Sequence, residues 1–204
     1  MTLTTTTLPL LLPLLLAAAA SAAGDYHRNS TTTDYIRSSC NATLYPDLCY
    51  TSLSRYSAAV QQSPRRLARV AIGVALSKVR RTASFLANNA SALADYGSDR
   101  RAAAALHDCR SNLGDAAEEI RGSLKQMRQL GAAGATEEAF RFQMSNVQTW
   151  MSAALTDEET CTDGFQDVAD GEVKAAVYAR AAEAKKYTSN ALALVNTYAA
   201  AGTP

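Results

Sequence analysis

Histidine and cysteine are scarce in this 204-residue chain, which contains only two histidines and four cysteines. A structural zinc site needs closely spaced cysteine pairs or clustered histidines, but eight residues separate even the nearest cysteines, Cys40 and Cys49. The redox-active C-x-x-C pair is missing, as are G-x-S-x-G, H-E-x-x-H and glycine-rich phosphate-binding motifs. These absences argue against a metal site and against common hydrolase and nucleotide-binding classes, and we expect the protein to need no cofactor.

Few side chains remain as candidates for catalysis. His107, beside Asp108, has the chemistry of a general base, but a half-exposed histidine on a helix is the more common situation. Asp157, Glu158 and Glu159 would need a cleft to act as acid and base, and at a helix end they are more typical of a solvated acidic surface. We therefore predict that the protein is not an enzyme, and we keep these three carboxylates as candidates for contact with a partner.

Charged side chains are absent from residues 1–23, where an apolar stretch runs from Leu8 to Ala20. Ala20-Ser21-Ala22 fits an A-x-A cleavage site, so the segment predicts a secretory signal peptide over 1–23. The apolar run is too short for a spanning helix, and two prolines interrupt it. No second run of spanning length follows, so we expect a secreted mature domain over residues 24–204 with no membrane anchor.

The remaining sequence agrees with export. Three sequons accept N-glycans only in an exported chain, and they lie at Asn29, Asn41 and Asn89. In an oxidising compartment an even number of cysteines predicts disulfides, here two bonds among Cys40, Cys49, Cys109 and Cys161.

Apolar residues recur at steps of three and four along most of the chain, as in Ile72, Leu76, Val79, Ala83 and Leu86. This spacing keeps them on one face of a helix, and no alternating strand pattern of any length occurs. The pattern and the intervening glycines predict helices near 64–91, 98–130, 136–160 and 166–200. Short turns between long helices make neighbours antiparallel, so the sequence predicts an all-α, up-down-up-down four-helix bundle.

The predicted bundle makes one cysteine pairing plausible. Cys109 lies 24 residues before the turn near Ala133, and Cys161 lies 28 residues after it. In an antiparallel pair of helices these positions differ in height by only about 6 Å. A Cys109–Cys161 bond would leave Cys40 to pair with Cys49, closing a small helical hairpin over about residues 30–60.

Charge is segregated, although the formal net charge of the whole chain is only +1. Residues 64–101 hold eight basic and two acidic residues, a net of +6, whereas residues 131–172 hold one arginine and nine acids, a net of −8. The two blocks either pair within the bundle or steer a partner toward it. Near-neutral net charge and predicted export argue against nucleic acid as that partner.

Four segments of the sequence occur in a recognisable order. They are Cys40-x-x-Thr43-x-Tyr45-Pro46-x-x-Cys49, Leu106-His107-Asp108-Cys109, Trp150-Met151-Ser152-Ala153-Ala154-Leu155-Thr156 with Glu159-Thr160-Cys161-Thr162-Asp163-Gly164-Phe165, and Ser189-Asn190-Ala191-Leu192-Ala193-Leu194-Val195. From about Tyr35 to Tyr198 the chain resembles the plant invertase and pectin methylesterase inhibitor family. The resemblance implies an N-terminal helical hairpin on a four-helix bundle, with disulfides Cys40–Cys49 and Cys109–Cys161.

The resemblance also implies a function. Members of this family are not enzymes; they bind a plant cell-wall or vacuolar enzyme stoichiometrically and block its active site. Invertase inhibitors usually carry a Pro-Lys-Phe motif before the last helix, but no proline lies between Cys161 and Pro204. We therefore expect a secreted, apoplastic inhibitor that forms a 1:1 complex with pectin methylesterase and covers its pectin-binding cleft. The alternatives are an invertase inhibitor and, from another class, a secreted carrier of an apolar ligand.

Overall fold

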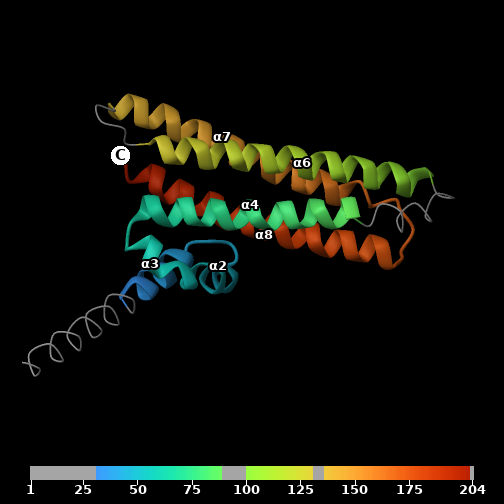
Figure 1. Ribbon diagram of the computed structural model, residues 1–204, viewed down its shortest axis with the longest axis horizontal. Helices are drawn as coiled ribbons and strands as arrows, with labels where there is room; N and C mark the ends of the chain where they lie inside the picture. Colours follow the sequence, from blue (N-terminus) through green and yellow to red (C-terminus); the bar gives the residue numbers. More distant parts are fainter. Residues whose placement is uncertain (1–30, 89–99, 131–135, 203–204) are drawn as a thin grey trace, which may run out of the picture.

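Four long helices make up the body of the molecule (Figure 1). The computed structural model describes residues 31–88, 100–130 and 136–202. The long helices within these ranges are α4 (Pro64–Asn88), α6 (Arg100–Gln129), α7 (Glu137–Asp163) and α8 (Glu172–Ala200). Both α4 and α7 pack against α6 and α8, so α4 and α7 occupy diagonal corners. The predicted four-helix bundle is confirmed.

The beginnings of two helices follow from their local sequence. Ser63 precedes α4, and its Oγ accepts a hydrogen bond from the backbone N–H of Arg66 at 3.3 Å. Pro64, the first residue of α4, has no N–H that would need such a partner. At the start of α7, the Thr136 side chain accepts from the N–H of Ala139 at 3.1 Å. Side-chain caps therefore fix where α4 and α7 begin.

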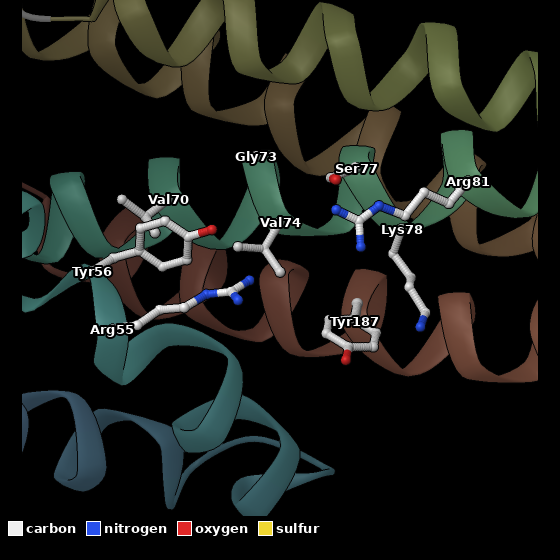
Figure 2. Close-up of a pocket in the computed structure, with 9 residues that line it drawn as sticks. All are labelled: Arg55, Tyr56, Val70, Gly73, Val74, Ser77, Lys78, Arg81 and Tyr187. Carbon is white, nitrogen blue, oxygen red and sulfur yellow. The ribbon is translucent and has the colours of Figure 1, made fainter.

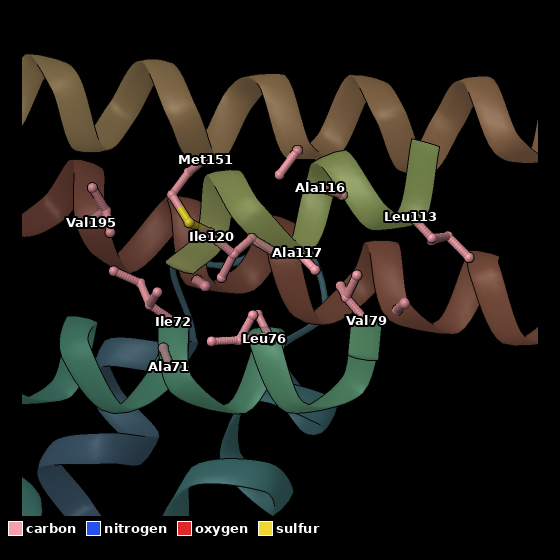
Figure 3. Packing of buried hydrophobic residues seen from close by; sticks show 14 of the residues in the cluster. Ala71, Ile72, Leu76, Val79, Leu113, Ala116, Ala117, Ile120, Met151 and Val195 are labelled. Atoms are coloured by element: carbon pink, nitrogen blue, oxygen red, sulfur yellow. The ribbon is translucent and has the colours of Figure 1, made fainter. Parts of the chain in front are cut away.

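The core lies along the common axis of the four helices (Figure 3). Ile72 and Val79 of α4, Ile120 of α6, Met151 of α7 and Val195 of α8 are fully buried there. Alanines at the same contacts, including Ala71, Ala116 and Ala117, have small side chains that let the helix backbones approach closely. The apolar stripes in the sequence thus become one continuous core, which places the polar faces of all four helices on the outside.

A smaller helical segment lies beside α4 and α8. Residues 31–40 are helical, and they are followed by α2 (Pro46–Leu53), a 3₁₀ turn (Ser54–Tyr56) and α3 (Ser57–Val60). Ile36, Leu53 and Val60 are buried in the contact with the bundle. Asn190 of α8 fastens the segment further: its Nδ2 donates to the backbone oxygen of Tyr45 at 2.9 Å, and its Oδ1 accepts from the N–H of Tyr45 at 3.1 Å.

The turn between α7 and α8 differs from the sequence prediction. The last helix starts at Glu172 and not at residue 166, and α7 continues past residue 160 to Asp163. The intervening turn is anchored because Phe165 and Val168 are buried, and Lys174 Nζ donates to the backbone oxygen of Val168 at 2.6 Å. Burial of these two apolar side chains in a non-helical turn explains why a helical pattern alone misplaced the boundary.

Candidate functional site

The carboxylates Asp157, Glu158 and Glu159 lie within α7, one turn before its end. Successive helical residues differ in direction by about 100°. The three side chains consequently meet three different surroundings, and they do not form one acidic patch.

Glu158 is in the core and has no solvent exposure. Thr188 Oγ1 of α8 donates a hydrogen bond to Glu158 Oε1 at 2.7 Å, whereas Oε2 has no hydrogen-bond partner in the described part of the chain. Burial raises the pKa of Glu158 to about 8, even though the Thr188 hydrogen bond and the nearby charge of Lys185 act in the opposite direction. The interpretation of Glu158 as part of a solvated surface that contacts a partner was therefore wrong.

The apolar spacing of α7 already contained the signal for this burial. The stripe Phe140, Met144, Val147, Met151 and Ala154 continues at steps of four and three to Glu158 and Cys161. A glutamate on the core face of a helix is therefore expected to lie inside the bundle.

Asp157 faces α6, where it interacts with Glu119. The pKa of Glu119 rises to about 7, first because the group is desolvated and then because the Asp157 charge and hydrogen bond favour its protonated form. Desolvation also raises the pKa of Asp157, while its hydrogen bond with Glu119 lowers it. The two carboxyl groups are thus suited to hold one proton between them, and sequence reasoning missed Glu119.

Glu159 is the member of the triplet that reaches the surface, with its side chain 58% exposed. Lys185 Nζ of α8 lies 2.7 Å from Glu159 Oε1. Further along the chain Asp163, Asp167 and Asp170 are exposed around the α7–α8 turn. We call Glu159, Asp163, Asp167 and Asp170 the acidic end of the bundle.

His107 and Asp108 are not arranged as a catalytic pair. His107 Nδ1 lies 3.3 Å from Asp108 Oδ1, and the two side chains are 75% and 73% exposed. Both groups are open to water, so neither is shielded in the way that a cleft would provide. Within residues 31–88, 100–130 and 136–202, no three or more His, Cys, Asp or Glu side chains form a group that could hold a metal ion.

The cysteines serve as cross-links in the described chain, which has no free thiol. Cys40 is bonded to Cys49 within the hairpin, and Cys109 of α6 is bonded to Cys161 of α7. Asn41, one of the sequon residues, is exposed next to the first of these bonds. Asn29, Asn89 and the predicted signal peptide lie outside the described residues.

A hollow of about 290 Å³ lies between the hairpin and the bundle (Figure 2). The residues that line it come from the hairpin, α4 and α8: Arg55, Tyr56, Val70, Gly73, Val74, Ser77, Lys78, Arg81 and Tyr187. Three of them are basic and none is acidic. Sequence reasoning identified the basic block to which Lys78 and Arg81 belong, but it could not place Arg55 of the hairpin beside them.

In the part of the chain that the structure describes, no helix is both long and apolar enough to cross a membrane. The polar outer faces of α4, α6, α7 and α8 are consistent with this finding, since each helix buries only one side.

Comparisons with known proteins agree on one family. Residues 34–194 match the family model described as plant invertase/pectin methylesterase inhibitor. "Pectinesterase inhibitor 3" of Arabidopsis thaliana is 40% identical over 169 residues, which are 83% of this chain and 81% of that protein. The "21 kDa protein" of Daucus carota is 40% identical over 168 residues, 81% of this chain and 84% of the relative. A crystal structure of a mutant pectin methylesterase inhibitor from Arabidopsis has a TM-score of 0.58 and 19% identity, covering 77% of this chain and 92% of that one.

Proposed function

Because the chain belongs to the plant invertase/pectin methylesterase inhibitor family, we propose that it inhibits a pectin methylesterase. The observation that carries this proposal is the 40% identity to a pectinesterase inhibitor across more than four-fifths of both chains. The absence of a proline between Cys161 and Pro204, where invertase inhibitors usually have their Pro-Lys-Phe motif, also favours the esterase over invertase.

The proposed mode of action is steric. The protein forms a 1:1 complex in which helices of the bundle cover the pectin-binding cleft of the esterase. Cross-links favour this mode, because the Cys109–Cys161 bond joins two neighbouring helices and limits their relative movement. A surface that is already ordered loses little conformational entropy when it binds.

The acidic end is the part of the bundle best suited to face the enzyme. Pectin becomes polyanionic as its esters are hydrolysed, so basic residues along the cleft of the esterase would attract the uronate groups. The exposed carboxylates Asp163, Asp167 and Asp170 resemble such a polyanion in charge, and the buried Glu158 has no part in this contact. Attraction between the two surfaces raises the rate of association.

The proposed location follows from the proposed target. Pectin is a cell-wall polymer, and the predicted signal peptide over residues 1–23 would direct the chain to the apoplast. Inhibition there keeps pectin methyl-esterified. Two-disulfide cross-linking is in keeping with an oxidising compartment outside the cytosol.

The test is a titration of purified pectin methylesterase with the mature protein, with methanol release from pectin as the readout. We expect activity to fall linearly until one inhibitor is present per enzyme and to remain low beyond that ratio. A parallel titration of invertase, measured by sucrose cleavage, should show no loss of activity. Inhibition of invertase alone would contradict the proposal and support the invertase alternative.

A further inference from the structure

Helix α4 has a charge composition unlike that of its neighbours. Its residues Pro64–Asn88 include no Asp or Glu but contain six basic residues: Arg65, Arg66, Arg69, Lys78, Arg80 and Arg81. None of the six is buried, because the opposite face of the helix supplies the apolar side chains of the core. The outer face of α4 is therefore a basic stripe in two parts, with three arginines near the start of the helix and three basic residues from Lys78 to Arg81.

In the hollow beside this stripe, two like charges converge. The guanidinium groups of Arg55 and Arg81 extend from opposite ends of the hollow toward its middle (Figure 2). Neither arginine takes part in any ion pair found in the described residues, whereas Lys78 is already paired with Glu183 at 2.7 Å. Arg55 also lies over the ring of Tyr56, with Cζ 5.0 Å from the ring centroid. An anion placed between the two guanidinium groups would attract both of them.

The hollow adjoins a second one along α4. The second hollow, of about 520 Å³, runs along α4 to Asn88 and shares Gly73, Ser77 and Arg81 with the first one. Arg80 lines this second part as well. The shared residues join the two hollows, and we call them together the basic groove. From Val70 to Asn88 the groove follows α4 for about 27 Å, which suits an extended ligand.

Gly73, in the floor of the basic groove, is not explained by packing within the protein. A glycine inside a helix is less favourable than an alanine. A Cβ atom at Gly73 would meet nothing within 4 Å, so the fold itself leaves room for a side chain. The missing side chain keeps the middle of the groove open, which allows a ligand to approach the backbone of α4.

Two tyrosines give the groove a second chemical character. Tyr56 of the hairpin and Tyr187 of α8 are half-buried and line the same hollow as Arg55 and Arg81. A cation lies over one face of each ring, Arg55 for Tyr56 and Lys78 for Tyr187, which leaves the opposite face for a ligand. Aromatic rings pack against the apolar faces of sugar rings, while guanidinium groups bind carboxylates with paired hydrogen bonds. A polymer of sugar units that each carry a carboxylate matches both features at once.

We propose that the basic groove between the hairpin and α4 binds de-esterified galacturonan, the carboxylate product of pectin methyl-ester hydrolysis. The choice of this polyanion rests on the proposed function, because pectin surrounds the protein only if it acts in the cell wall. The groove lies on the side of α4, at the corner of the bundle diagonal to α7. Binding would hold the inhibitor on regions of pectin where an esterase has already worked.

The test is calorimetric titration of the purified protein with a galacturonate oligomer at low salt and, in parallel, with its fully methyl-esterified form. We expect the acid form to bind and the neutral ester to bind at least about tenfold more weakly, because charge-assisted hydrogen bonds to the guanidinium groups are lost. The double change R55Q/R81Q should weaken binding of the acid form about tenfold or more. R110Q/R128Q removes the same charge from exposed positions of α6 outside the groove, and it should change affinity less than about twofold.

A variant that keeps the charge of the protein unchanged tests whether binding depends on the shape of the groove or only on general electrostatic attraction. Gly73→Leu fills the floor of the groove and improves helix propensity, so the protein should fold and bind the oligomer at least about fivefold more weakly. Any one of three results would overturn the proposal: equal binding of the acid and ester forms, equal losses of affinity in R55Q/R81Q and R110Q/R128Q, or unchanged affinity in Gly73→Leu. Esterase inhibition by the same proteins is measured separately: failure of the wild type to inhibit refutes the proposed function, whereas failure to bind the oligomer refutes the groove.

Discussion

The diagonal corners of the bundle, α4 and α7, carry opposite charge and use it differently. All six basic residues of α4 remain at least partly exposed, and no carboxylate occurs on that helix. On α7, Glu158 is buried in the core and Asp157 is turned toward Glu119 of α6. The charge counted along the sequence thus predicts the surface charge of α4 well, but it overestimates the surface charge of α7.

The two charged corners also do not neutralise each other. Within the described residues, no ion pair joins α4 to α7; instead α8 pairs with both, through Lys78–Glu183 and Glu159–Lys185. In the described residues, the acidic block and the basic residues of α4 are therefore connected through α8 and not by direct ion pairs. Helix α8 separates two surfaces of opposite sign, which leaves each of them available for a different ligand.

The two disulfides are expected to differ most in how much they stabilise the fold, with Cys109–Cys161 on the α7 side and Cys40–Cys49 in the hairpin beside α4. The Cys109–Cys161 bond spans 52 residues and the Cys40–Cys49 bond spans nine. Because a longer closed loop restricts the unfolded chain more, C109A/C161A should lower the free energy of unfolding by about 4 kcal/mol and C40A/C49A by about 2.5 kcal/mol. Urea denaturation of both variants measures this, and equal losses would contradict the ranking.

A strong pH dependence is expected from Glu158. Its pKa is about 8 in the folded protein, against an ordinary glutamate value in the unfolded chain. Between these two pKa values the folded state binds a proton that the unfolded chain has lost. The free energy of unfolding is therefore highest at acidic pH and falls as the pH rises toward 8. Since each pKa unit corresponds to about 1.4 kcal/mol, the loss should amount to a few kcal/mol.

Glu158→Gln should remove the part of the pH dependence that Glu158 contributes, because the amide stays neutral and its oxygen still accepts from Thr188. The part that comes from Glu119, whose pKa is raised to about 7, should remain. The matched control is Glu159→Gln at the adjacent surface position, which breaks only an exposed ion pair with Lys185 and should cost less than about 1 kcal/mol. Thermal unfolding of all three proteins from pH 4.5 to 8.5 checks this. If the stability of Glu158→Gln fell with rising pH as steeply as that of the wild type, the buried Glu158 carboxyl group would not be the cause of the pH dependence.

Asn190→Ala should weaken the attachment of the hairpin to the bundle. The change removes two hydrogen bonds to Tyr45 and leaves the Tyr45 backbone groups without their partner. We expect a loss of about 2 kcal/mol and faster amide exchange in α2 than in α7. Gln148→Ala, which breaks an exposed side-chain hydrogen bond to Asn196, should cost less than about 0.5 kcal/mol. Similar exchange in α2 and α7 of the Asn190 variant would mean that the hairpin does not depend on this anchor.

The architecture was largely predictable from the spacing of apolar residues, which fixed the faces of the four long helices. Even the buried pair was encoded, because Glu158 and Thr188 both continue the apolar stripes of their helices. What spacing could not supply was the side-by-side placement of distant segments. The approach of Arg55 to Arg81 and of Asp157 to Glu119 depends on how elements pack, and periodicity within one helix carries no information about that packing.

The smallest expected effects concern the rate of binding to the esterase. D163N/D167N/D170N at the acidic end should slow association several-fold at low salt and flatten its salt dependence, because long-range attraction is screened over about 8 Å at 0.15 M salt. The matched variant R66Q/R69Q/R80Q on α4 should not slow association. Stopped-flow measurements at three salt concentrations distinguish the two sides, and equal slowing by both variants would contradict a binding role for one side alone.

Carboxyl-group footprinting of the inhibited complex tests most directly whether this protein binds its enzyme through the acidic end. Glu137 and Glu138 provide the internal reference, since they are exposed at the other end of α7, about 39 Å from Asp163. Addition of pectin methylesterase should reduce labelling of Asp163, Asp167 and Asp170 and leave Glu137 and Glu138 unchanged. Full inhibition with unchanged labelling of the acidic end, or with protection of Glu137 and Glu138 instead, would contradict this assignment.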